Sequence, residues 1–260
     1  WSEGGGFTLM ANTDMTVADN LNVHDNSAQH GGGGIYCPHS NISLTNSIIN
    51  NNEVASDGNN SGGGIKLNIS LSVETETMNN SIISNCIISD NYADQGAGIS
   101  YNIGDGNIID QPTLVISNSV ITKNRCSLSS FNGSAFHAVT LLNGTITFIN
   151  TTIANNSRAG IYLRLQGMNT DFHPVIFNTI LYGNLDNKQI QFSTVDLSVS
   201  GVSLDISYSL VQEGQDSIAT ALNDTLNWGT GNIDMNPMFS DTASGDFRLL
   251  ALSPAINAGH

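Results

Sequence analysis

Residues 116–121 read Ile-Ser-Asn-Ser-Val-Ile, and this six-residue motif recurs along the chain without internal gaps. Its last residue is aliphatic in all seven copies, and Asn stands three residues before it in six of them. Asn stands again three residues after it in the first six copies. A register this regular indicates an internal repeat. The copies are residues 18–23, 44–49, 83–88, 116–121, 148–153, 176–181 and 205–210.

A second motif, a pair of mostly small residues followed by an apolar one, comes after each of the first six copies. The distance between equivalent aliphatic residues of the first motif varies from 26 (Val23 to Ile49) to 39 (Ile49 to Ile88). Variation of this kind is typical of loops that project from stacked repeats. The copies of the second motif are Gly33-Gly34-Ile35, Gly63-Gly64-Ile65, Ala97-Gly98-Ile99, Ser134-Ala135-Phe136, Ala159-Gly160-Ile161 and Lys188-Gln189-Ile190, with an earlier one at Gly5-Gly6-Phe7.

Strands this short cannot bury an apolar face alone, but a chain that coils once per repeat stacks each strand about 4.8 Å from its counterpart. We therefore predict one all-β domain over residues 1–260, a right-handed parallel β-helix of about seven or eight turns. Asn at a turn can adopt left-handed backbone angles and bond its amide to the Asn of the next turn. Leucine-rich repeats, propeller blades and helical solenoids need residue patterns that are absent here.

The composition supports a folded, acidic protein. Hydrophobic residues make up 39% of the chain and charged residues 11%, with a formal net charge of −15. That charge disfavours nucleic acids and anionic membrane surfaces as partners. No stretch of 18 apolar residues is present, so we expect no membrane insertion of this chain.

The three cysteines, Cys37, Cys86 and Cys126, lack the spacing of a zinc site or a redox motif. Cys86 lies in an apolar run, which predicts a buried residue. A single disulfide between Cys37 and one of the other two stays open.

The pairing of Gly33-Gly34-Ile35 with Ile49-x-x-Asn52 resembles the repeats of polymorphic outer-membrane proteins and related bacterial β-helix surface proteins. The stretch from Asn236-Pro237 to Ala258-Gly259 resembles the closing turn of secreted proteins of the choice-of-anchor Q type. These resemblances imply an extracellular or cell-surface location and a closing C-terminal turn over residues 232–260. Because Gly4-Gly5-Gly6 already lies within a repeat, we expect a segment of a longer protein. The resemblance names no activity, since fold alone cannot.

Basic residues are scarce, and the register groups a few of them. Lys123 stands two residues after Ile121, and its equivalent one turn earlier is Asp90, so both are expected to share a surface patch with Arg125. A polysaccharide lyase would need a base here, and Lys123 or Arg125 would supply it. A solvated surface ion pair is the alternative.

Acidic residues also recur at one repeat position. Asp25 and Asp90 are equivalent, and Asn51 stands between them. Carboxylates one or two turns apart offer oxygen ligands for Ca²⁺, whereas solvated turn acids are the alternative. No other cofactor is expected. Further acidic candidates in the adjoining loop are Asp94, Asp105 and Asp110.

Three tyrosines mark the predicted glycan-binding face. Tyr36, Tyr101 and Tyr162 each follow a strand-start aliphatic by one or two residues, which predicts one outer face that also carries Lys66 and His137. Aromatic faces stack on pyranose rings, so such a face would bind carbohydrate. Scattered half-buried aromatics that cover the coil are the alternative.

Two functions remain open. The first is a non-catalytic extracellular or cell-surface module, a stalk, adhesin or glycan-binding segment whose partner is a carbohydrate or a host or cell-surface ligand. The second is a polysaccharide lyase or another carbohydrate-active enzyme. The acidic net charge counts against an anionic polymer as substrate. We therefore favour the non-catalytic module.

Overall fold

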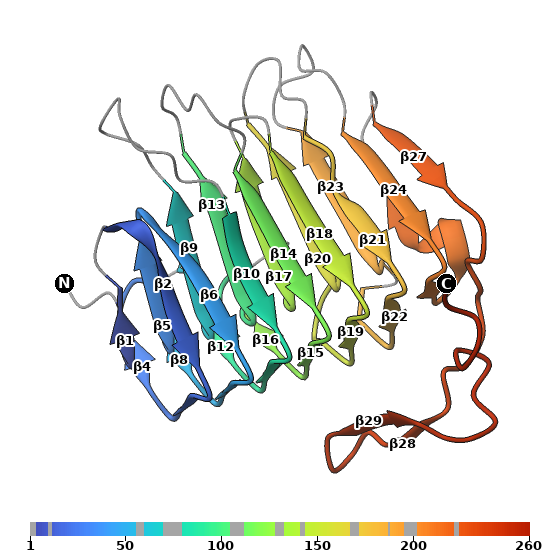
Figure 1. Ribbon diagram of the computed structural model, residues 1–260, viewed down its shortest axis with the longest axis horizontal. Coiled ribbons are helices and arrows are strands. Elements are labelled where there is room, and N and C mark those ends of the chain that lie inside the picture. The colour runs from blue at the N-terminus through green and yellow to red at the C-terminus, as the bar shows by residue number, and fades with distance from the viewer. Residues whose placement is uncertain are drawn as a thin grey trace.

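The chain folds into a parallel β-helix (Figure 1). The computed structural model describes residues 4–9, 12–55, 60–69, 80–104, 112–127, 133–140, 144–166, 172–186, 188–194, 202–220 and 224–260. Each turn of the coil contributes one strand to sheet A and one to sheet B, and all but the last contribute one to sheet C. We number the turns 1 to 8 after their sheet A strands.

Sheets A and B run the length of the coil with eight strands each, all paired in parallel. Sheet A consists of β1 (Phe7–Thr8), β5 (Ile35–Pro38), β9 (Ile65–Ile69), β13 (Ile99–Ile103), β17 (Phe136–Thr140), β20 (Ile161–Leu165), β23 (Ile190–Thr194) and β26 (Ile218–Ala219). Sheet B consists of β2 (Asn12–Asp19), β6 (Ser40–Thr45), β10 (Asn80–Ser84), β14 (Thr113–Ser117), β18 (Thr145–Ile149), β21 (Val175–Phe177), β24 (Ser203–Ser207) and β27 (Thr225–Trp228).

Two smaller sheets complete the wall. Sheet C consists of β3 (Asn22–His24), β7 (Ile48–Asn50), β11 (Ile87–Ser89), β15 (Val120–Thr122), β19 (Thr152–Ala154), β22 (Ile180–Tyr182) and β25 (Leu210–Val211). Sheet D occurs only in turns 1 to 4, as β4 (Ser27–Ala28), β8 (Glu53–Val54), β12 (Tyr92–Ala93) and β16 (Arg125–Cys126). A short 3-10 helix, η1 (Gly214–Ser217), follows sheet C in turn 7.

The predicted fold is confirmed, and the turn count differs slightly from the expectation. The strands of turns 1 and 8 lie at the edges of sheets A and B. Six turns, numbers 2 to 7, therefore have a neighbouring turn on each side. The expectation was a coil of seven or eight such turns. One continuous core fills the coil, and it contains the aliphatic residues that end six copies of the first motif. These are Val23, Ile49, Ile88, Ile121, Ile153 and Leu181.

Each of the two predicted rows of asparagine takes one of the two predicted roles. One row adopts the left-handed backbone conformation, and the other bonds its amides from turn to turn. The outer Asn row, at the corner between sheets B and C, has positive φ in every turn from 1 to 6. The inner Asn row, at the next corner, bonds side chain to side chain along the coil. The outer row is Asn20, Asn46, Asn85, Asn118, Asn150 and Asn178, and the inner row is Asn26, Asn52, Asn91, Asn124, Asn156 and Asn184.

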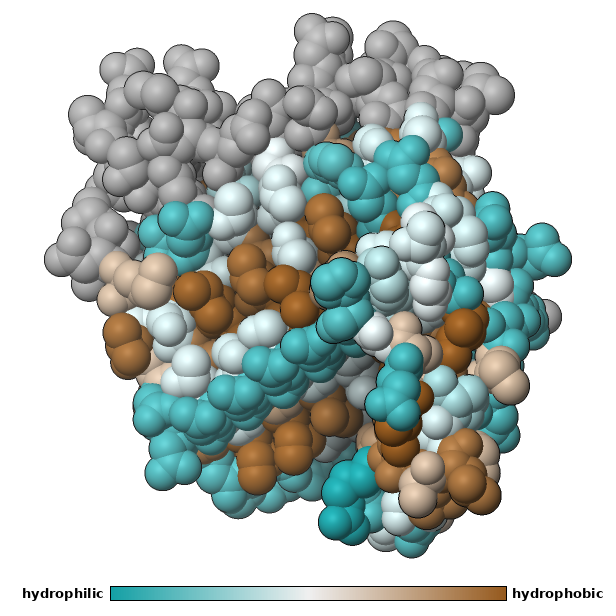
Figure 2. Space-filling view, turned by 45° about the vertical axis from the view of Figure 1, so that its right-hand side comes forward, coloured by the Kyte–Doolittle hydropathy of each residue, from teal (hydrophilic) through white to brown (hydrophobic). Residues whose placement is uncertain are grey.

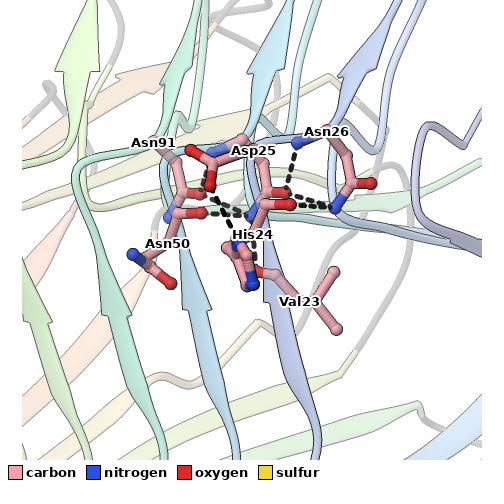
Figure 3. A network of polar contacts seen from close by, with 7 residues as sticks. Val23, His24, Asp25, Asn26, Asn50 and Asn91 are labelled. Carbon is pink, nitrogen blue, oxygen red and sulfur yellow. Dashed lines mark hydrogen bonds and ion pairs between the residues drawn. The ribbon is translucent and has the colours of Figure 1, made fainter.

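Figure 3 shows how the inner row is held. The Asn52 amide nitrogen donates to the carbonyl oxygen of Val23 at 2.9 Å and to the side-chain oxygen of Asn91 at 3.1 Å. The Asn52 side-chain oxygen in turn accepts from the amide nitrogen of Asn26 at 2.9 Å. Each amide thus joins three turns, which satisfies backbone carbonyls at a buried corner.

Glycine precedes the sheet A strands of turns 2 and 3, where the backbones of neighbouring turns come close, whereas turns 5 and 7 carry Ala135 and Gln189 at the equivalent position. A Cβ on Gly34 would lie 2.7 Å from the carbonyl oxygen of Gly64, and one on Gly64 would lie 2.7 Å from that of Gly98. A side chain would therefore force neighbouring turns apart. This is the packing reason for the second sequence motif.

The C-terminal segment, residues 232–260, does not form another turn of the coil. After one bridge between Leu210 and Ile233, it leaves the coil as the antiparallel hairpin of β28 (Phe239–Asp241) and β29 (Asp246–Leu249) (Figure 1). Residues 250–260 then return toward turns 6 and 7, where the backbone nitrogen of His260 donates to the side-chain oxygen of Asn178 at 3.0 Å. The expected closing turn is thus an external segment.

Cys37, Cys86 and Cys126 are all buried and free, so the cysteines form no disulfide. Burial raises the pKa of Cys37 and of Cys126 to about 12. Cys86 is buried as predicted, and its thiol donates to the carbonyl oxygen of Ser84.

Within the described residues, no helix is long and apolar enough to cross a membrane.

Candidate functional site

Four of the five residues predicted for the glycan-binding face share one row on the outer side of sheet A. Strand register aligns Tyr36 with Lys66, Lys66 with Ser100, Ser100 with His137, and His137 with Tyr162. The Lys66 ammonium lies 5.7 Å from the centroid of the Tyr36 ring, and the His137 and Tyr162 rings are 5.4 Å apart. The sequence register therefore placed these four side chains correctly on one row.

Tyr101 is the exception, and its predicted outward position is wrong. It lies two residues after the inward-facing Ile99, whereas Tyr36 lies one residue after the inward-facing Ile35. Side chains alternate across a strand, so Tyr101 points into the coil, where it packs in the core. Burial raises the pKa of its phenol well above the ordinary value.

The row on sheet A is closed rather than an open groove. Tyr36, Ser100, His137 and Tyr162 are all buried. Within the described part of the chain, neither ring nitrogen of His137 nor the hydroxyl of Ser100 has a hydrogen-bond partner. Burial, and to a lesser degree the charge of Arg164, lowers the pKa of His137 to about 3, so the ring is neutral. Carbohydrate binding by this row stays a prediction.

The lyase candidates are brought together only in part. Asp90 and Lys123 line a cleft of about 290 Å³ between sheet C and the hairpin, which we call the hairpin cleft. Arg125 lies in sheet D, where it is exposed, and does not line this cleft. The opposite wall carries Asp246 and Arg248.

The cations of the hairpin cleft are engaged in structural contacts. The Lys123 ammonium donates to the carbonyl oxygen of Ala243 at 2.9 Å and so fastens the tip of the hairpin to turn 4. Arg248 binds Asp246 through two hydrogen bonds of 2.9 and 2.7 Å. These bonds, and above all the side-chain bond from Arg248, lower the pKa of Asp246. Both cations already have partners, which argues against their use as a base.

The Ca²⁺ candidates lie on the exposed corner between sheets C and D. Asp25 and Asp90 both have positive φ and are separated by the turn that carries Asn51, hence by about two strand spacings of 4.8 Å. Asp25 pairs with its neighbour His24 at 2.6 Å (Figure 3). Among the described residues, no group of three His, Cys, Asp or Glu side chains could hold a metal.

The other acidic candidates divide between described and undescribed parts of the chain. Asp94 is buried, and its carboxylate accepts from the backbone nitrogen of Asn60 at 3.1 Å. Asp105 and Asp110 lie outside the described residues.

A larger cleft, of about 420 Å³, lies at the corner between sheets B and C, beneath the C-terminal segment. We call it the tail cleft. Its floor repeats one triplet in turns 5, 6 and 7, formed by the positive-φ residue and the two residues after it. Residues Ala255, Asn257, Ala258 and Gly259 close it from outside. The floor triplets are Asn150-Thr151-Thr152, Asn178-Thr179-Ile180 and Tyr208-Ser209-Leu210.

The middle residue of each triplet is fixed by hydrogen bonds. The Thr179 hydroxyl donates to the carbonyl oxygen of Phe177 at 3.0 Å, and the Ser209 hydroxyl donates to that of Ser207 at 2.9 Å. The Ser209 hydroxyl also accepts from the backbone nitrogen of Thr179 at 3.1 Å. This hydroxyl row makes the floor of the cleft rigid.

Tyr208 is the residue that sets the tail cleft apart. It has a φ of 51°, at the position where the six preceding turns carry Asn. A bulky side chain is rare in this conformation, and such strain concentrates at functional sites. The ring makes edge contacts with Phe177 and His260, with centroids 5.6 and 4.9 Å apart. Strand pairing aligns Leu181 with Val211, so the seventh copy of the first motif is residues 206–211, one residue later than predicted. In this register Tyr208 takes the place of Asn.

The tail cleft is uncharged. Its lining residues contribute amide groups, hydroxyl groups, a phenol and aliphatic side chains, and they include no Asp, Glu, Lys, Arg or His. Such a lining can hydrogen-bond and stack on a neutral polar ligand, but it holds no acid–base pair for catalysis.

Comparisons with known proteins yield no relative of this chain. No protein-family model, no curated protein and no solved structure matches it.

Proposed function

We propose that this chain is a non-catalytic β-helix module of an extracellular or cell-surface protein, and that it binds neutral carbohydrate in the tail cleft. The observation that carries the proposal is the lining of that cleft, which combines amides, hydroxyls and the Tyr208 ring without a charged group. The module would serve as a stalk or adhesin that holds a glycan.

The chemistry of sugars fits this lining. A pyranose ring presents hydroxyl groups at its edge and C–H bonds on its faces, so it needs hydrogen-bonding groups beside an aromatic or aliphatic surface. Asn150 and Asn257 supply amides, and Tyr208 and Ile180 supply apolar surface. The net charge of −15 disfavours the binding of anionic polymers and does not oppose the binding of neutral ones.

The second candidate is a polysaccharide lyase at the hairpin cleft. It is favoured by one observation, the presence of Asp90, Lys123 and Arg248 around a single hollow. It is disfavoured by the contacts that occupy Lys123 and Arg248. We therefore rank it below carbohydrate binding.

The test is calorimetric titration of the chain with neutral and uronic oligosaccharides, together with a Tyr208→Asn variant. Asn restores the residue that the other turns carry at this backbone conformation, so the fold should hold while the ring is lost. We expect neutral sugars to bind and the variant to lose about tenfold or more in affinity. The control, Tyr92→Asn in sheet D, should bind normally.

Two results would overturn the proposal. One is the absence of binding by every neutral glycan tested, or equal binding by the Tyr208→Asn variant. The other is release of unsaturated sugar from a uronic polymer, seen as new ultraviolet absorbance and abolished in Lys123→Ala. That second result would establish the lyase.

A further inference from the structure

The floor of the tail cleft continues far beyond the cleft itself. The triplet that lines it in turns 5 to 7 recurs in turns 2 to 4, where Ile87 and Val120 also line the hairpin cleft. These triplets are Asn46-Ser47-Ile48, Asn85-Cys86-Ile87 and Asn118-Ser119-Val120. In each triplet the first side chain is exposed, the second is buried, and the third faces out from sheet C. One surface pattern therefore extends along the coil. Residues 255–259 lie over it in turns 5 to 7, and the hairpin lies beside its sheet C edge in turns 3 and 4.

Backbone geometry alone does not account for the asparagines of this surface. The corner that follows sheet C also requires positive φ in turns 1 to 6 and uses four residue types for it. The corner between sheets B and C requires the same conformation and uses Asn in each of those turns. The second corner is thus an internal control. The amides at the first corner supply more than the turn, because they bond between turns, as Asn150 does to Asn118, and also lie at the surface. The residues of the control corner are Asp25, Asn51, Asp90, Lys123, Asn155 and Gly183.

The rows beside the amides complete an amphipathic surface. On the sheet C side, the neighbouring side chains Ile48 and Ile87 are 42% and 45% exposed and present an aliphatic surface. On the sheet B side, Ser84 and Ser117 bear hydroxyl groups that bond to each other at 3.0 Å. In Figure 2 a straight hydrophilic stripe crosses the coil and is bordered by hydrophobic side chains. Hydroxyl, amide and aliphatic groups therefore lie in parallel lines.

We infer that this surface, the glycan track, binds an extended neutral polysaccharide along the axis of the coil, with part of the chain seated in the tail cleft. The inference rests on the proposed function of that cleft and names its ligand as a polymer. Turns repeat about every 4.8 Å, a distance close to the length of one pyranose unit in an extended chain, so each sugar would meet one triplet. Amides would bond to sugar hydroxyls, and Ile48 and Ile87 would pack against ring C–H faces.

Chain-length dependence tests the track separately from the cleft. The probes are neutral β-1,4-linked hexopyranose oligosaccharides, namely a disaccharide, a tetrasaccharide and an octasaccharide, titrated by calorimetry. A ligand confined to the cleft reaches full affinity at short length, whereas a track predicts that the octasaccharide binds about tenfold more tightly than the disaccharide.

The variant is the double substitution Asn85→Gly with Asn118→Gly. Glycine keeps the positive-φ turns and removes only the amides, so the coil should stay intact. We expect disaccharide affinity to be unchanged and the gain with length to disappear. Asn51→Gly, at the control corner, should keep the full gain, and Ile87→Ser should lose part of it.

The outcomes separate the two proposals. Equal affinity for the disaccharide and the octasaccharide in the unmodified chain would overturn the track and leave the cleft intact. A gain with length that survives the double variant would also overturn it. Absence of binding at every length would remove the proposed function and the track together.

Discussion

Asn118 and Asn124 stand three residues before and three residues after the same buried aliphatic, Ile121, yet they have opposite environments. Asn118 is exposed, with a φ of 48°, and its side-chain oxygen accepts from Asn150 at 3.2 Å. Asn124 is fully buried, and its amide nitrogen donates to the carbonyl oxygen of Ile88 and to Asn156. Residue type and spacing are identical, so the difference lies in where the turn occurs.

At the first corner the Asn itself adopts the left-handed conformation, which carries its side chain outward. At the second corner the preceding residue, Lys123, adopts that conformation, with a φ of 55°, and Asn124 turns inward. The backbone conformation at one position therefore decides whether an amide is buried in the coil or lies at its surface. The comparison predicts that substitutions in the two rows lower the free energy of unfolding by different amounts.

The largest effect is expected at the inner row. Asn124→Ala removes bonds to the two neighbouring turns, 3 and 5, and leaves the Ile88 carbonyl without its side-chain donor. We expect the free energy of unfolding to fall by about 3 kcal/mol. Chemical denaturation monitored by circular dichroism measures it. A loss no greater than that of Asn118→Ala would remove the distinction between the rows.

The buried row of sheet A extends the comparison to pH. The folded-state pKa of His137 is lowered from 6.5 to about 3, so the folded state stays neutral while the unfolded state binds a proton below pH 6.5. The stability contribution is full above pH 6.5 and falls as the pH drops toward 3. Between pH 7.5 and pH 5 we expect the free energy of unfolding to fall by about 2 kcal/mol from this cause.

Denaturation of a His137→Phe variant isolates this contribution, since the variant should lose that part of the pH dependence. His24→Asn, at an exposed histidine, should retain it. An unchanged pH profile in His137→Phe would show that His137 is not protected from protons in the folded state.

How much of this was predictable depends on whether a feature is local. The inward aliphatics, the two Asn rows and the alignment of Lys66 with His137 follow from register, because equivalent residues stack in parallel pairs. The side of the strand on which Tyr101 lies also follows from the period of two. The prediction was wrong because it treated a residue two positions after the inward-facing Ile99 like a residue one position after it. These are properties of a single repeat.

The remaining features depend on contacts between distant segments. The tail cleft exists because residues 255–259 lie over turns 5 to 7. That placement comes from aromatic contacts such as Tyr182 with Phe239, whose ring centroids are 6.4 Å apart, and Phe239 with Phe247 at 5.1 Å. Repeat periodicity carries no information about where a non-repeating segment docks. The burial of His137 likewise depends on its surroundings and not on its register.

A smaller effect is expected at the outer row. Asn118→Ala places a Cβ residue without amide compensation in the left-handed region, which should cost about 1 kcal/mol. Asn118→Gly should stay within about 0.5 kcal/mol of the original stability. Thermal unfolding of the two variants side by side measures the difference. An equal loss in both would mean that the amide, rather than the backbone, matters for folding.

The smallest effect is expected at Lys123. Lys123→Asn relieves a lysine held at positive φ but removes the bond to the Ala243 carbonyl. These changes oppose each other, so global stability should move by less than about 0.5 kcal/mol. Hydrogen exchange in the hairpin should nevertheless become faster. Unchanged exchange at residues 239–249 would show that Lys123 does not fasten the hairpin.

The C-terminal segment has a consequence for how the coil comes apart. In a solenoid each turn touches only its two neighbours, so unfolding can begin at either end and proceed one turn at a time. This segment contacts Lys123 in turn 4, Tyr182 in turn 6 and Tyr208 in turn 7, so its contacts extend beyond one pair of neighbouring turns. It therefore connects the turns of that half of the molecule to one another. Turns 4 to 7 should open as one cooperative unit, while turns 1 and 2 fray independently.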